Sequence, residues 1–124
     1  MSERFSTLFS IVAGLFGAVG IALSAMAAHV GDDRYLAIAA AMLLFHAAAL
    51  LGLSQSTPAR LRLAPLSALL ITIGTLLFAG DLSARSFLGD RLFPMAAPSG
   101  GIALIAGWLS IAAGAAVAAV RRRG

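Results

Sequence analysis

The sequence predicts an all-α integral membrane protein whose four transmembrane helices form one antiparallel bundle. Three observations carry this prediction. Hydrophobic residues make up 60% of the 124 residues and charged residues only 11%. The mean hydropathy is +0.98. Four apolar stretches are each long enough to cross a hydrocarbon core of about 30 Å, which takes roughly 20 helical residues. A water-soluble chain of this length could not bury so much apolar surface.

The four stretches are expected as helices over residues 5–28, 34–53, 61–82 and 96–120. They are continuous apolar runs rather than alternating ones, so helices and not barrel strands satisfy the backbone in lipid. Pro58, in the polar segment "SQSTPARLR", lies where a helix cannot continue. The segment "DLSARSFLGDRLFPMAAPSGG", residues 81–101, is expected to lie along the outer interface with its apolar side chains toward lipid. We expect a single domain, residues 1–124.

The first stretch contains the pattern Ala25-Met26-Ala27, which could be the cleavage site of a secretory signal peptide. Its leading charge is a single Arg4 balanced by Glu3, and its apolar run is longer than a normal signal core. We therefore expect it to be a membrane-spanning helix.

The arginines predict the orientation, because short cytoplasmic loops are enriched in basic residues. All nine basic residues are arginine, and with four crossings six of them lie on the side of the two termini. We therefore expect both termini in the cytoplasm of a bacterial inner membrane. The six are Arg4, Arg60, Arg62, Arg121, Arg122 and Arg123; the other side carries Arg34, Arg85 and Arg91 with Asp32, Asp33, Asp81 and Asp90. We interpret the C-terminal run Arg121–Arg123 as an anchor that fixes the topology. Binding to anionic lipid headgroups is the alternative.

Small residues recur at helical spacing in the first and last helices, and small residues let helices in lipid approach closely. We interpret both stripes as packing seams, with a ligand groove or a homodimer face as the alternative. The first stripe comprises Gly14, Ala18, Ala22 and Ala25, and the second comprises Ala103, Gly107, Ser110 and Gly114.

Four segments occur in an order that resembles a known family: "GLFGAVGIALSAMAAH" (14–29), "MLLFHAAAL" (42–50), "LLFAGDLSA" (76–84) and "PSGGIALIAGWLSIAAG" (98–114). Together they resemble the YgdD-like small inner-membrane family, domain of unknown function 423, which has mitochondrial transmembrane relatives. The resemblance covers nearly the whole chain. It implies a four-helix inner-membrane protein with no agreed activity, no cofactor and no catalytic assignment. Asp81 departs from the pattern, since the family usually has a small polar residue there.

His46 is the one polar side chain in the otherwise apolar run "MLLFHAAALLG", residues 42–52. It lies twelve residues past Arg34, about 18 Å below the outer boundary at a rise of 1.5 Å per residue. Polar side chains at that depth are expected on the neighbouring helices at Thr72 or Thr75 and at Trp108 or Ser110. We therefore expect a neutral His46 that bonds across helices to one of these side chains or to a backbone carbonyl.

Metal and haem sites have poor support. The chain has no cysteine, and His29, at the outer interface, differs in depth from His46 by more than about 12 Å. The carboxylates lie only at the rim, so we expect no metal, no haem and no other cofactor. Asp81 and Arg85 are spaced i, i+4 and are expected to pair where the helix leaves the membrane, with an ion or headgroup gate as the alternative.

No catalytic residues stand out, because no nucleophile has a base at local helical spacing. Arginines at helix ends without interleaved aromatics argue against nucleic-acid binding. We expect a non-catalytic structural or accessory inner-membrane protein, in contact with the lipid bilayer and with a larger membrane complex or further copies of itself. The first alternative is a small transporter or channel with a proton-sensitive polar point at His46. The second is an outer-leaflet lipid-processing enzyme that would use His29, Asp81 and Ser83 or Ser86.

Overall fold

The computed structural model describes residues 2–31 and 33–124, so Asp32, one of the acids expected on the outer side, lies outside the described residues. The described chain is all-helical. Its four helices are α1 (Glu3–His29), α2 (Arg34–Ser54), α3 (Ala64–Leu88) and α4 (Ala96–Arg123). Each is long and apolar enough to cross a membrane. The prediction of four membrane-spanning helices is therefore confirmed.

Local chemistry sets the ends of the helices. The N–H of Phe5 donates to the Ser2 hydroxyl at the start of α1, and the N–H of Leu36 donates to the Asp33 carboxylate at the start of α2. These caps satisfy backbone donors that the first turn of a helix leaves free. α3 has proline in its first turn and is followed by Gly89, whose φ of 77° is left-handed and suits glycine.

The predicted bounds of the third helix are wrong. It begins at Ala64 rather than Leu61, and it continues beyond Leu82 to Leu88. The charged groups of "DLSARSFL" do not end the helix, because Asp81 and Arg85 pair with each other one turn apart. The expected interfacial loop is correspondingly shorter, since most of residues 81–101 belong to α3 and α4.

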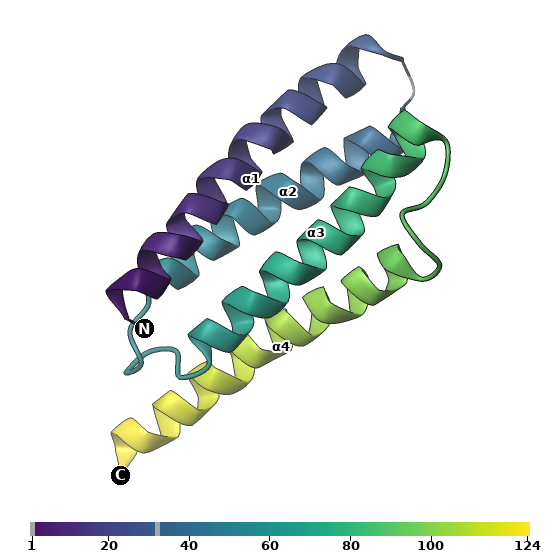
Figure 1. Cartoon of the computed structure of the whole chain (residues 1–124). Helices are drawn as coiled ribbons and strands as arrows, with labels where there is room; N and C mark the ends of the chain where they lie inside the picture. The colour runs from purple at the N-terminus through teal and green to yellow at the C-terminus, as the bar shows by residue number, and fades with distance from the viewer. Residues whose placement is uncertain (1, 32) are drawn as a thin grey trace.

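The helices lie side by side in chain order, which we call the helix row (Figure 1). α1 packs on α2, α2 on α3 and α3 on α4, whereas α1 makes only slight contact with α3. α1 and α4 form the two edges of the row, and the N and C termini lie at the same end. The core includes the buried side chains of Phe9 and Phe16 of α1, Leu36 and Leu50 of α2 and Ile71 of α3.

The closest approach within the row is between α3 and α4, at glycines. A Cβ on Gly100 would lie 2.7 Å from the backbone nitrogen of Phe78 and 2.8 Å from the carbonyl oxygen of Gly74. A Cβ on Gly107 would lie 2.8 Å from Ile71 Cγ1, and one on Gly114 would lie 2.9 Å from the Leu63 nitrogen. The stripe predicted on α4 thus faces α3, and it includes Gly100, which the sequence analysis did not place there.

The packing seam predicted on α1 is wrong within the chain. Gly14, Ala18 and Ala22 are exposed, and a Cβ on Gly14 would meet nothing within 4 Å. α1 instead meets α2 through Phe9, Phe16 and Gly20, with Leu44 Cγ 2.9 Å from a Cβ built on Gly20. The phenylalanines offer far more van der Waals contact than the alanines, so they decide which face of α1 turns inward.

Candidate functional site

His46 lies on the α3 side of α2 and is buried, with 5% of its surface exposed. Its Nδ1 lies 2.7 Å from the carbonyl oxygen of Met42, one turn earlier on the same helix. Its Nε2 accepts a hydrogen bond of 3.2 Å from the indole N–H of Trp108 on α4. This bond connects α2 to α4, which have α3 between them in the row.

The two contacts together define the protonation state of the imidazole. A carbonyl oxygen can only accept a hydrogen bond, so Nδ1 carries the hydrogen. The indole N–H can only donate, so Nε2 presents its lone pair. Only the neutral tautomer with hydrogen on Nδ1 satisfies both partners. A protonated ring would have to give up the bond to Trp108.

The other predicted partners make no hydrogen bond with His46 among the described residues. The Ser110 hydroxyl is 2.6 Å from that of Ser67, and each also lies within hydrogen-bond distance of a carbonyl oxygen about one turn earlier, that of Gly107 and that of Leu63. Each hydroxyl has one hydrogen, so one serine donates to the other and the second donates to its carbonyl. Thr72 and Thr75 have buried Oγ1 atoms without a hydrogen-bond partner among the described residues. Ser67 is fully buried, and the sequence analysis missed it because a serine in an apolar helix gives no sign of its facing residue.

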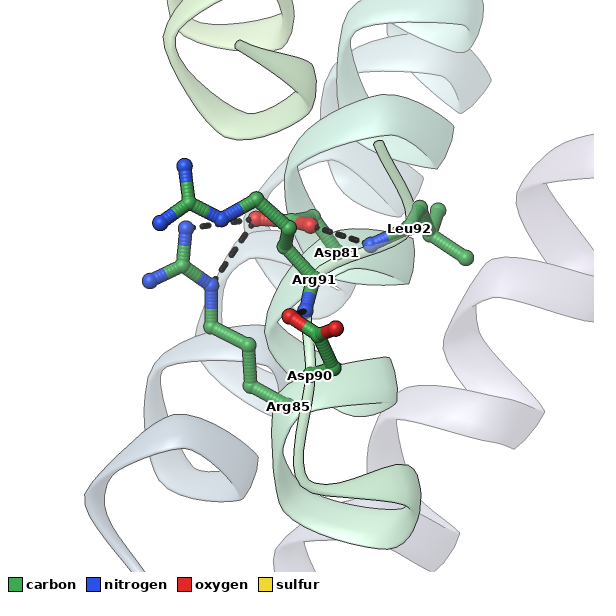
Figure 2. A network of polar contacts seen from close by, with 5 residues as sticks. All are labelled: Asp81, Arg85, Asp90, Arg91 and Leu92. Carbon is green, nitrogen blue, oxygen red and sulfur yellow. Dashed lines mark hydrogen bonds and ion pairs between the residues drawn. The ribbon is translucent and has the colours of Figure 1, made fainter. Parts of the chain in front are cut away.

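A second polar cluster surrounds Asp81 near the carboxyl end of α3 (Figure 2). Asp81 is completely buried. Its Oδ2 accepts from Nε of Arg85 and pairs with Nη2, both at 3.0 Å, while its Oδ1 accepts at 2.8 Å from the backbone N–H of Leu92. The carboxylate therefore joins its own helix to the segment between α3 and α4.

The same end of the molecule also connects α3 to α2. The guanidinium of Arg85 lies over the ring of Tyr35, 5.9 Å from its centre. The hydroxyl of Ser86 donates to Oδ2 of Asp33, the residue that caps α2. Asp33 entered the sequence analysis only as an outer-side charge, and Tyr35 was not singled out. Long-range contacts of this kind have no local signal in the sequence.

The hydrogen bond from Ser86, and after it the one from the backbone of Leu36, lowers the pKa of Asp33 below its ordinary value of 3.8. A lowered pKa in the folded state means that the ionised carboxylate stabilises the fold. This stabilisation is complete above the pKa of the unfolded chain and is lost as the pH falls through the folded-state pKa.

We therefore expect the thermal stability of the purified protein in detergent to fall as the pH is lowered through 4 and below. Asp33→Asn and Ser86→Ala should both reduce the acid-dependent part of the loss, because each removes the bond that favours the charged carboxylate. Ser56→Ala is the control, since that hydroxyl donates only to the backbone of Leu53. Equal acid sensitivity in all four proteins would contradict the assignment.

Two residues of the enzyme alternative, Asp81 and Ser86, already have other hydrogen-bond partners. His29 is exposed at the end of α1, while the two oxygens of Asp81 are occupied by Arg85 and Leu92. The hydroxyl of Ser86 donates its hydrogen bond to Asp33. Among residues 2–31 and 33–124, no three histidine or acidic side chains lie close enough to hold a metal ion.

Sequence analysis also missed a serine cluster between α1 and α2, near the end that carries the termini. Ser6 donates to the carbonyl of Ser54, and the hydroxyl of Ser10 donates to that of Ser54 at 3.1 Å. The Gln55 amide donates to the same Ser54 hydroxyl. These bonds hold α1 on α2 where the chain turns toward α3.

Comparison with known proteins finds a matching family model and relatives of similar length. A family model described as "Protein of unknown function (DUF423)" matches residues 9–101. The chain is 29% identical over 123 residues to the UPF0382 inner membrane protein YgdD of Escherichia coli (strain K12), covering 93% of this chain and 92% of that protein. The protein of the same name from Shigella flexneri has the same identity and coverage. No solved structure matches the chain.

Proposed function

Since the chain belongs to the DUF423 family, we propose that it acts without catalysis, as a structural or accessory component of a larger membrane complex. It is a multi-pass protein of the inner membrane, as its four apolar helices and its YgdD relatives indicate. The family itself carries no assigned activity, so the accessory role is argued from the polar groups of this chain.

One observation supports the accessory role above the others: the buried ionisable groups are occupied by internal bonds. Both nitrogens of His46 are hydrogen-bonded, to Met42 and Trp108. Both oxygens of Asp81 are bonded, to Arg85 and Leu92. A catalytic base or a proton carrier needs a free lone pair facing substrate or water. Groups that bond one another instead hold helices in register, which suits a structural component.

The experiment uses the chain tagged at its natural expression level and extracted in digitonin. We expect it to migrate in native electrophoresis far above its own 12.6 kDa, with subunits in fixed stoichiometry. Those subunits, when tagged in turn, should recover the chain. A chain that migrates as a monomer or only with copies of itself would contradict the accessory role.

We further propose that the helices form one antiparallel bundle and a single domain, with both termini in the cytoplasm. The support is the arginine distribution, because the end of the row that carries the termini also carries the Arg60/Arg62 connection. Single cysteines at residue 124 and at Val30 should react with a membrane-impermeant maleimide from opposite sides of the inner membrane. Labelling of both from the same side would refute this topology.

A small proton transporter is the second candidate, and the observation that favours it is a histidine buried among membrane-spanning helices. The two roles differ in their response to His46→Leu. For a structural bond we expect a loss of about 0.6 kcal/mol, the average for interhelical hydrogen bonds in membranes. Proton flux into liposomes should then equal that of empty vesicles for both wild type and variant. A flux in the wild type that His46→Leu abolishes would instead establish transport.

A further inference from the structure

Six arginines gather at the end of the helix row that carries the termini, where the only acidic residue is Glu3. All six are exposed, and none forms an ion pair among residues 2–31 and 33–124. At the opposite end, by contrast, Arg85 is paired with Asp81. The unpaired six are Arg4, Arg60, Arg62, Arg121, Arg122 and Arg123. Their charges are available to an anion from outside the chain.

The packing of α4 shows which of these arginines lie on one face of the molecule. A Cβ on Gly114 would lie 2.9 Å from the backbone nitrogen of Leu63 and 3.4 Å from that of Arg62. Ala118, one turn later, is also buried. Gly114, Ala118 and Arg121 are spaced i, i+4, i+7 and share one face of the helix. Arg121 therefore continues the face of α4 that contacts Arg62, about 10 Å beyond Gly114.

An apolar surface adjoins Arg121. α4 continues beyond the first turn of α3 toward the C terminus (Figure 1). A shallow hollow of about 300 Å³ lies along this part of α4, and we call it the α4 hollow; Ala116, Val117, Val120 and Arg121 line it. Val117 is 44% exposed and Val120 is 72% exposed. The hollow thus joins exposed hydrocarbon to a guanidinium.

The position of Arg121 along α4 restricts what binds there. It directly follows Val120, the last apolar residue of this membrane-spanning helix. A long arginine side chain at such a point keeps its charged end at the interface, where lipid phosphates lie. Basic clusters beside membrane-spanning helices attract anionic headgroups. A phospholipid with net negative charge matches both the arginines and the apolar hollow.

We propose that Arg62 and Arg121 bind the headgroup phosphate of an anionic phospholipid whose acyl chain lies in the α4 hollow against Val117 and Val120. The lipid belongs to the leaflet at the end of the row that carries the termini. The proposal concerns lipid binding and does not depend on the accessory role.

The test compares dioleoyl phosphatidylglycerol with dioleoyl phosphatidylcholine, which have the same acyl chains and differ in the net charge of the headgroup. Each is titrated into the full-length protein in a neutral detergent, with bound lipid counted by native mass spectrometry and stabilisation followed by thermal unfolding. We expect one phosphatidylglycerol per chain, bound about 25-fold more tightly than phosphatidylcholine, since each arginine contributes about fivefold. The preference should weaken as the salt concentration rises.

Arg62→Gln and Arg121→Gln should each reduce this preference about fivefold, and the double variant should abolish it. Arg123→Gln is the matched control. It removes the same charge from the same end of α4, but lies about 200° around the helix from Arg121, so it should keep the preference. Equal losses in Arg121→Gln and Arg123→Gln would mean that net charge alone attracts the lipid, and would overturn the proposal. So would equal binding of the two lipids to the wild type.

The place of the acyl chain is tested separately. Val117→Trp, which fills the α4 hollow, should weaken binding of phosphatidylglycerol, whereas Ile105→Trp, at another exposed position of α4, should not. Unchanged binding to Val117→Trp would contradict the assigned place of the chain. Inorganic phosphate at the concentration of the lipid should not displace it. Displacement would identify a site for free phosphate and overturn the assignment to a lipid.

Discussion

Gly100→Ala is expected to destabilise the helix row by about 3 kcal/mol, the upper end of what overpacking usually costs. The new Cβ would meet backbone atoms of α3, the nitrogen of Phe78 at 2.7 Å and the carbonyl oxygen of Gly74 at 2.8 Å. Backbone cannot rotate away as a side chain can, so α3 and α4 would have to separate along their closest contact. The measurement is the free energy of unfolding in mixed micelles titrated with a denaturing detergent.

Two other glycines provide matched comparisons. Gly107→Ala should cost less, because its Cβ would meet the Ile71 side chain at 2.8 Å but backbone only at 3.4 Å, although Gly107→Leu should loosen the contact as well. Gly14→Ala should stabilise slightly, by up to about 1 kcal/mol, because it improves helix propensity and meets nothing within 4 Å. The expected loss of unfolding free energy is therefore largest for Gly100→Ala, smaller for Gly107→Ala and absent for Gly14→Ala. If Gly100→Ala were as harmless as Gly14→Ala, the close approach of α3 and α4 would be wrong.

Asp81→Ala is expected to cost about 3 kcal/mol, the lower end of the cost of removing one partner of a buried ion pair. The variant leaves Arg85 without its carboxylate and the Leu92 N–H without an acceptor. The lower end applies because the Arg85 side chain is 30% exposed and can turn toward water or headgroups. The segment between α3 and α4 should then be released, and proteolysis near Gly89 should become faster.

Asp90→Ala is the control for this prediction. Asp90 is exposed, and its carboxylate accepts only from the N–H of the next residue, Arg91 (Figure 2). A surface change of this kind should stay within about 0.5 kcal/mol. Arg85→Ala supplies a second check, because it leaves the fully buried Asp81 side chain without its ion-pair partner and with only the Leu92 N–H as a donor, so it should also destabilise the fold. If Asp81→Ala and Asp90→Ala lowered the free energy of unfolding by the same amount, Asp81 would be a solvated residue at the membrane rim and not a buried structural one.

Membership of the inner-membrane family and the presence of four spanning helices could be predicted because both depend on local information. Hydropathy over about 20 residues identifies a span wherever its neighbours lie, and glycine-rich segments in a given order identify the family. The same locality explains the error at α3. A cluster of charges resembled the end of a span, whereas the i, i+4 pair of Asp81 and Arg85 lets the helix continue to Leu88.

By itself, the sequence determined the class of the protein, its compartment and the set of polar residues inside the membrane. The tertiary structure alone decided which of these residues meet: Trp108 with His46, Ser67 with Ser110, and Leu92 with Asp81. It also decided that α1 turns Phe16 and not Gly14 toward α2. The physical reason is that helix formation depends on neighbours along the chain, whereas the rotation of each helix about its axis depends on packing against residues far away in sequence.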